Sequence, residues 1–242
     1  MPRPMPGSAG RATVPAARRD APEKEPFDID RVFALLRRAT AGLPQAAMFE
    51  LRDRGHASLF EQLVSALISA RTRDETTMPV SLRLFAEART PEAMAALPEE
   101  RIAELLYGAT FPEPKARDIR TLSRRILEEH GGRVPDTLEG LTAFRGVGPK
   151  IAGLALGVAL GQPHIAVDVH VHRVTNRWGY VATRTPEATL KTLDAKLPDR
   201  YRVEINERLV PFGKHICTGE RPRCSTCPLL AQCRQVGVTS HR

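Results

Sequence analysis

The chain has 242 residues, with 36 Lys and Arg against 28 Asp and Glu, so its formal net charge is +8. This balance favours a polyanionic partner, nucleic acid first and an anionic membrane surface second. No apolar run approaches the ~20 residues of a membrane-spanning helix, and the 42% of hydrophobic residues suffices for the core of one larger or two small domains.

The first 26 residues are rich in Pro, Ala, Arg and Gly and contain no aromatic residue. This composition predicts a disordered basic tail. The segment has no apolar stretch of the kind found in secretory signal peptides. A basic arm that adds non-specific attraction to DNA is an alternative, and so is an organellar transit peptide, although the prolines argue against an amphipathic helix.

From residue 28 onwards, apolar residues recur at three- and four-residue spacing, and no stretch alternates as a strand would. Ser58 and Glu61 form a capping-box pattern, while Thr90 and Thr185 each precede a proline at a first helical position. Helices are therefore expected over residues 28–39, 58–68 and 201–212, and from Lys115 to a glycine cap at 131–132. Further helices are expected to begin after a polar break at 69–74, after Thr90, at Pro98, at a cap formed by Asp136, after Asp168 and after Thr185. Residues 40–57 and 107–114 are expected to be irregular. The predicted fold class is all-α.

The stretch from Leu141 to His172 contains a Gly-Val-Gly turn, Gly146-Val147-Gly148, between two apolar helical runs. Glycine allows a positive φ angle and a close approach of the backbone to a ligand. The free N–H groups and positive dipole end of the second helix would suit a phosphate. A plain helix-turn-helix with a glycine cap is the alternative.

Two polar residues in this stretch are candidates for chemistry. Lys150 lies at the start of the second helix, where a lysine most often meets solvent or a phosphate. An unprotonated amine there could instead attack a sugar C1′ and form a Schiff base. Asp168 precedes a helical run and is expected to cap it. A capping carboxylate held in this way can also stabilise a cationic transition state.

All four cysteines lie near the C-terminus, in the pattern Cys217-x6-Cys224-x2-Cys227-x5-Cys233. Disulfides would be expected to spread over the fold, so a metal site in a reducing compartment is the better interpretation. Four thiolates over this span can hold either Zn²⁺ or a [4Fe–4S] cluster. The spacing alone leaves both open.

The string LTAFRGVGPKIAGLALG, followed by IAVDVHVHRVTNRWG, resembles the helix-hairpin-helix and Gly/Pro…Asp signature of the endonuclease III family of DNA glycosylases. That family's motif reads roughly L-x-x-L-P-G-V-G-x-K-T-A and is followed by V-D-T-H. The resemblance extends from Phe60 to Cys233. It implies two helical lobes flanking a DNA-binding cleft: a six-helix bundle at 55–161, with the hairpin at about 136–160, and an iron–sulfur cluster lobe formed by 27–54 and 162–242.

The resemblance also implies the chemistry. Lys150 would be the nucleophile, Asp168 the essential acidic residue, and the four cysteines the ligands of a [4Fe–4S] cluster. The function would be that of a base-excision-repair glycosylase with AP-lyase activity, which removes oxidised pyrimidines and cleaves 3′ to the abasic site by β-elimination. The partner would be double-stranded DNA with a damaged base or an abasic site, bound by a monomer that is cytoplasmic, and nucleoid-associated if bacterial.

Three segments depart from the family pattern. Arg71 replaces a glutamine in S-A-Q-x-T-D, the wedge loop G-L/F-Y-x-x-K-A lacks its glycine and has added prolines around Phe111, and Val169 replaces the threonine of V-D-T-H. Arg71 and Phe111 remain candidate DNA contacts. The other candidate contacts, beside the cysteines, are Lys214, Arg221 and Arg223. These departures also motivate an alternative function, a damage-binding or lyase-only paralogue with a weak or shifted glycosylase substrate range.

Overall fold

The structure of the protein, a computed structural model, describes residues 24–242. Within that range the regular structure is helical and contains no strand, which confirms the all-α prediction. The helices are α1 (Ile29–Thr40), α2 (Ala47–Asp53), α3 (Leu59–Ser69), α4 (Asp74–Phe85), α5 (Pro91–Ala96), α6 (Glu99–Leu105), α7 (Pro112–His130), α8 (Leu138–Thr142), α9 (Pro149–Leu160), α10 (Val169–Trp178), α11 (Pro186–Lys196) and α12 (Glu204–His215), with two 3₁₀ turns at Asp199–Tyr201 and Cys224–Thr226.

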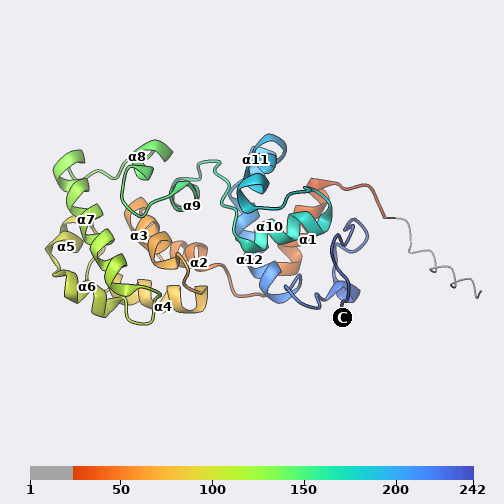
Figure 1. The fold of residues 1–242 in the computed structure, drawn as a ribbon, viewed down its shortest axis with the longest axis horizontal. Coiled ribbons are helices and arrows are strands. Elements are labelled where there is room, and N and C mark those ends of the chain that lie inside the picture. Colours follow the sequence, from red (N-terminus) through yellow and green to blue (C-terminus); the bar gives the residue numbers. More distant parts are fainter. Residues whose placement is uncertain (1–23) are drawn as a thin grey trace, which may run out of the picture.

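The helices form two lobes, which stand side by side in Figure 1. One lobe contains α3 to α9 around a core that includes Leu63, Leu84 and Ile119. The other contains α1, α10, α11, α12 and the cysteine segment, around Phe33, Trp178 and Leu209. A smaller apolar cluster joins elements of both lobes: Ala46, Met48, Phe49, Ala66, Val158 and Val210. The two predicted lobes are therefore present.

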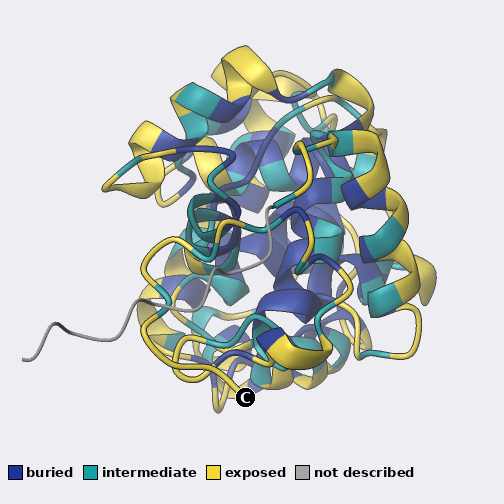
Figure 2. Ribbon diagram, turned by 90° about the vertical axis from the view of Figure 1, so that its right-hand side faces the viewer, coloured by how far each residue is buried: buried dark blue, intermediate teal, exposed yellow. Residues whose placement is uncertain are grey.

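The helix α3 is the centre of the first lobe. Every residue from Phe60 to Ile68 is buried, including the polar Glu61, Gln62 and Ser65. The helix packs against α9, the second helix of the glycine hairpin, and also contacts α4 and α7. The dark interior of Figure 2 shows how completely the central helices are covered. A helix buried on all sides is a rigid base for the loops at its ends.

Several helix starts lie where the capping signals predicted. The Ser58–Glu61 capping box forms, Asp28 caps α1, and Thr90 and Thr185 cap α5 and α11 ahead of their prolines. Gly131, at φ +58°, ends α7. The predicted cap at Asp136 is wrong, because the hydroxyl of Thr137 accepts the bond from the Gly140 N–H instead.

Two segments expected to be irregular are partly helical. Residues 40–57 contain α2, and residues 107–114 contain the first turn of α7, which begins at Pro112 rather than Lys115. The polar break ends earlier than expected because α4 begins at Asp74, and α12 begins at Glu204 rather than at Tyr201. Although α2 belongs to a range assigned to the cluster lobe, it packs against α3, α4 and α9.

The predicted disordered tail, residues 1–26, lies outside the described residues up to position 23. From Lys24 the chain runs along the cysteine segment. Lys24 Nζ donates to the Leu230 carbonyl at 2.9 Å, and the Glu25 N–H donates to the Ala231 carbonyl, also at 2.9 Å. The Phe27 ring stacks on Tyr180 with a centroid distance of 4.9 Å. Lys24 and Glu25 thus fasten the start of the described chain to the cysteine segment, and Phe27 fastens it to the loop after α10.

In the described part of the chain, no helix combines the length and the apolar character that crossing a membrane requires.

Candidate functional site

A cleft of about 400 Å³ lies between the two lobes and brings the two predicted reactive residues together. Lys150 reaches it from α9 of the first lobe, and Asp168 from the start of α10 in the second. Asp74, His170 and Lys214 line the same cleft. Residues 18 positions apart in sequence therefore share one solvent-filled space, as an amine and a carboxylate acting on one substrate must.

The glycine hairpin connects α8 to α9. Gly146 adopts φ +81°, and a Cβ added there would lie 3.1 Å from Asp118 Oδ2, so glycine suits both the conformation and the space. Gly148 does not use this freedom: it is extended, at φ −89°, and it precedes α9 as the N-cap residue without a side-chain hydrogen bond. Pro149 follows at the first helical position, where its missing N–H is not needed. The Val147 side chain is buried.

The N-terminus of α9 is an open helix end. No side chain caps it and its first turn contains no acidic residue. Lys150 is in this first turn and is exposed to the cleft. An open helix N-terminus of this kind, with a lysine in its first turn, attracts a phosphate group.

Asp168 caps α10 as predicted. Its Oδ1 accepts hydrogen bonds from the His170 N–H at 2.9 Å and the Val171 N–H at 2.8 Å. These bonds fix the carboxylate at the edge of the cleft. Val169, which replaces the family threonine, is 61% exposed, so the missing hydroxyl faces solvent rather than the core.

His170 lies in the first turn of the same helix and connects the cleft to the cysteine segment. Burial lowers the pKa of its imidazole, and Nδ1 faces Arg173 Nη2 at 3.1 Å. Arg173 also donates to the Gly213 carbonyl at 2.9 Å and to the Cys217 carbonyl at 3.2 Å. The helix that carries Asp168 is thereby bonded to the backbone of the first cysteine.

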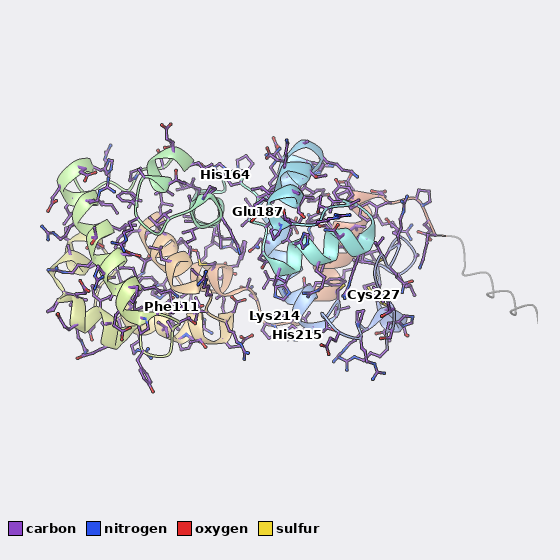
Figure 3. All side chains as sticks on the ribbon, viewed as in Figure 1. Phe111, His164, Glu187, Lys214, His215 and Cys227 are labelled. Atoms are coloured by element: carbon purple, nitrogen blue, oxygen red, sulfur yellow. The ribbon has the colours of Figure 1, made fainter. Side chains whose placement is uncertain are left out.

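Lys214 of α12 bridges the two lobes at the mouth of the cleft. Its Nζ lies 3.0 Å from Asp74 Oδ2 and 2.8 Å from Glu75 Oε1, both on α4. Burial opposes the charge, but these two carboxylates raise the pKa of Lys214. Figure 3 shows Lys214 where the lobes meet. A phosphate contact by Lys214 would therefore have to replace existing ion pairs.

Arg71 and Phe111 lie on two adjacent loops of the first lobe. Both adopt the left-handed conformation, at φ +59° and +57°, which is unusual for residues other than glycine. Phe111 is 55% exposed and projects from the lobe that contains α4 to α7 (Figure 3). Arg221 and Arg223 are also exposed, on the cysteine segment of the other lobe.

The four cysteines surround one small apolar cavity, closed by Trp178, Phe212 and Ile216. All four are free of disulfide bonds. Arg177 Nη1 donates to Cys217 Sγ at 3.5 Å, and the Gln235 N–H donates to Cys233 Sγ at 3.4 Å. Figure 3 shows Cys227 on the side of its lobe away from the cleft.

The cysteine segment has some of the features that a metal centre requires. Among residues 24–242, no three His, Cys, Asp or Glu side chains converge closely enough to count as a metal-ion site. The sulfur atoms nevertheless face a common cavity, and two of them accept N–H hydrogen bonds of the kind that stabilise thiolates. Burial raises the pKa of the Cys227 thiol to about 12. The donor set thus fits a cationic group that takes the place of the thiol protons.

Sequence reasoning assigned no role to Lys115, which the structure places among the most buried charged residues. It occupies the lysine of the wedge-loop pattern, and that was the available signal. His170 and Asp74 were also not singled out, although each lies beside a predicted residue and lines the cleft.

Comparison with known proteins gives a consistent result. Residues 64–199 match the family model described as "HhH-GPD superfamily base excision DNA repair protein". Endonuclease III of Thermotoga maritima is 41% identical over 182 residues, which cover 75% of this chain and 85% of that protein. A non-covalent endonuclease III–DNA complex superposes with a TM-score of 0.73 at 28% identity, and a trapped endonuclease III–DNA covalent intermediate with a TM-score of 0.72 at 30% identity. Each match covers 86% of this chain and 94% of the other.

Proposed function

The chain belongs to the HhH-GPD superfamily of base excision DNA repair proteins, within the endonuclease III family, and on that premise we propose which of its residues carry the reaction. It is a DNA glycosylase of base excision repair with the AP-lyase activity typical of the family, and its partner is DNA that contains a damaged base or an abasic site. The proposal concerns Lys150 as nucleophile and Asp168 as its acidic partner. The observation that carries it is their meeting in one cleft from opposite lobes.

The chemistry follows from an amine next to a sugar. The unprotonated Nζ of Lys150 attacks C1′ of the extruded nucleotide, the C1′–N bond breaks, and the base leaves with the electron pair and takes up a proton. The sugar ring opens to a Schiff base on Lys150. Loss of a C2′ proton then expels the 3′ phosphate, which breaks the strand by β-elimination. Each step needs a fixed amine and a stabilised cation.

Asp168 supplies the second requirement. Two backbone N–H groups hold its carboxylate at the edge of the cleft, so no reorganisation is needed when positive charge develops on the sugar. The exposed first turn of α9 would meet a phosphate of the bound strand through the backbone of Gly146, Val147 and Gly148. Only the backbone of Val147 can take part, because its side chain is buried.

The remaining DNA contacts are assigned by position. Phe111 would insert into the base stack and Arg71 would occupy the space left by the extruded nucleotide. Lys214, Arg221 and Arg223 would contact phosphates. Residues 55–161 would provide the hairpin and Lys150, while 27–54 and 162–242 would provide Asp168 and the cysteines.

We further propose that Cys217, Cys224, Cys227 and Cys233 hold a [4Fe–4S] cluster. When bound, such a cluster would supply cross-links among four parts of the cysteine segment. What supports this is the common apolar cavity, the free thiols and the N–H···S contacts. Cysteine ligands of this kind need a reducing compartment, and this requirement supports our proposal that the enzyme is cytoplasmic, and nucleoid-associated if it is bacterial.

Borohydride trapping tests the central proposal. Wild-type holoenzyme and Lys150→Ala would be incubated with duplexes that carry either an oxidised pyrimidine or an abasic site. We expect a covalent adduct on both duplexes for the wild type and none for the variant. An adduct only at the abasic site would indicate the lyase-only alternative. Absence of any adduct from the wild type, with DNA bound, would indicate a damage-binding protein.

A further inference from the structure

The two loops that carry Arg71 and Phe111 are bonded to each other. The Thr110 N–H donates to Thr72 Oγ1 at 3.1 Å, and Thr110 Oγ1 donates to the Arg71 carbonyl at 2.9 Å. Arg71 and Phe111 both have left-handed backbones in these loops. Such conformations persist only where the surroundings hold them.

A buried lysine lies beneath this contact. Lys115, in the first turn of α7, is only 9% exposed. Its Nζ donates to the Ile68 carbonyl at 2.5 Å, to the Ala70 carbonyl at 2.8 Å and to Thr72 Oγ1 at 2.9 Å. The ammonium group therefore donates three hydrogen bonds to the segment that leads from α3 into the Arg71 loop. Lys115 itself lies four residues after Phe111 in the chain, so it links this segment to the Phe111 loop.

The partners of Lys115 explain why a cation is placed there. The carbonyls of Ile68 and Ala70 are at the C-terminal end of α3, where helix carbonyls have no partner within the helix and the dipole is negative. A buried lysine without such partners would be costly, and burial does lower the pKa of Lys115 to about 8. Burying the Lys115 ammonium group costs desolvation free energy, and its three hydrogen bonds in return hold the two loops together.

We propose that Lys115 is a positioning residue for lesion probing: it joins the Arg71 loop to the Phe111 loop, so that both side chains enter the DNA as one rigid unit. This inference rests on the DNA contacts proposed for Arg71 and Phe111. Lys115 itself is buried and is not expected to touch DNA. Its effect would appear only on substrates whose base stack must be opened.

The test compares two substrates that share their chemistry. One is a duplex with an abasic site, and the other is the same abasic strand without its complement. Only the duplex needs a wedge and a gap filler. In the holoenzyme, Lys115→Met removes the three hydrogen bonds and retains a similar side-chain length. A displacement of about 1 Å costs up to about 100-fold in rate, so we expect kcat on the duplex to fall by about 10- to 100-fold. Cleavage of the single strand should stay within twofold.

A base-analogue fluorophore opposite the abasic site gives a second readout. In the wild type its fluorescence should rise on binding as the stack opens, and in Lys115→Met this rise should be lost. Lys191→Met is the matched control, because Lys191 is exposed on α11 of the other lobe. If Lys115→Met fails to fold, Thr72→Val removes one acceptor of Lys115 and should give a smaller loss in the same direction.

Three results would overturn the inference. Equal losses on both substrates, with a lower melting temperature, would mean that Lys115 only stabilises the fold. Unchanged duplex cleavage by Lys115→Met, alongside losses in Phe111→Ala and Arg71→Ala, would mean that the loops need no join. If the Phe111 and Arg71 variants themselves cleave the duplex like the wild type, the proposed DNA contacts fail, and this inference fails with them.

Discussion

Phe111 shows how a single residue can be strained by its backbone and useful through its side chain. At φ +57° it occupies a conformation that costs an L-residue roughly 1–2 kcal/mol relative to its usual regions. Pro112 follows at the first position of α7 and fixes where the helix begins. The left-handed turn is what directs an aromatic ring outward immediately before a helix.

This strain predicts that the usual order of stability of glycine and alanine variants is reversed at position 111. Within a helix or strand, a variant with glycine is less stable to unfolding than one with alanine by roughly 0.5–1 kcal/mol. At position 111 we expect Phe111→Gly to be more stable than Phe111→Ala, by about 1 kcal/mol, because glycine enters the left-handed region freely. Chemical denaturation of the two variants measures the difference. Alanine being the more stable would show that the backbone changes conformation when the ring is removed.

At the scale of elements, α3 is notable because opposite charges occupy its two ends. Glu61 closes the capping box at its first turn and pairs with Arg89 at 2.7 Å, while Lys115 binds the carbonyls at its last turn. Negative charge at the N-terminus and positive charge at the C-terminus both match the helix dipole. A helix with buried polar residues is thus stabilised at both ends.

Glu61 gives this arrangement a pH dependence. Burial alone would raise its pKa, but hydrogen bonds from Ser58, Arg89 and His56 outweigh burial and hold the pKa below its ordinary value of 4.5. The unfolded chain therefore takes up this proton at a higher pH than the folded chain does. The stabilisation from Glu61 is complete above about pH 4.5 and is lost as the pH falls through the folded-state pKa.

The corresponding prediction concerns Glu61→Gln. At pH 7 we expect the variant to be less stable than the wild type by about 1–3 kcal/mol, because buried polar partners lose a charged acceptor. The difference should narrow as the pH is lowered below 4. Urea unfolding at a series of pH values measures it. A difference independent of pH would mean that packing, rather than the carboxylate charge, is what the variant loses.

The elements also show what the sequence could predict. Helix starts marked by local caps were found, because Ser58 with Glu61 and Thr90 with Pro91 signal within a few residues. Helix α2 was missed since no side chain caps it and its short apolar face is set by packing of Met48 and Phe49. The start of α7 was missed because its prolines also suit a loop.

The candidate site divides in the same way. The capping role of Asp168 was readable because its partners are two and three residues away. The partners of Lys214 and Lys115 are 140 and 47 residues away in sequence, so no local pattern announces them. The resemblance to the family identified the candidate site residues, but which of them contact one another could be seen only in the folded structure.

At the scale of the whole molecule, the net charge of +8 attracts DNA, but only basic side chains that are exposed and unpaired can bind its phosphates directly. Arg221 and Arg223 are exposed beside the cysteines, and neither forms an ion pair with any residue in the range 24–242. Arg101 is exposed as well, but it is paired with Glu87 and Glu104 on the other lobe. Arg221 and Arg223 can therefore bind phosphates without breaking an ion pair within that range, whereas Arg101 cannot.

Salt titration distinguishes them. Each phosphate contact contributes about −0.9 to the slope of log K against log salt concentration. We expect Arg221→Ala and Arg223→Ala each to make the slope less negative by about 0.9 and to weaken binding to damaged and undamaged duplexes alike. Arg101→Ala should leave the slope unchanged. Fluorescence anisotropy over a range of salt concentrations measures it, and an unaltered slope in the Arg223 variant would remove that contact from the proposal.

The discontinuous second lobe also has a consequence for how the chain is made. Arg37 of α1 hydrogen-bonds to Glu204 of α12, 167 residues later. At roughly 5–20 residues per second, a ribosome needs roughly 8–33 s to deliver that partner. During this interval the apolar face of α1, with Val32, Phe33 and Leu36, has no lobe to join. The apolar face of α1 therefore lacks its contacts with α12 until this last helix has emerged, and the cysteines that follow it emerge later still.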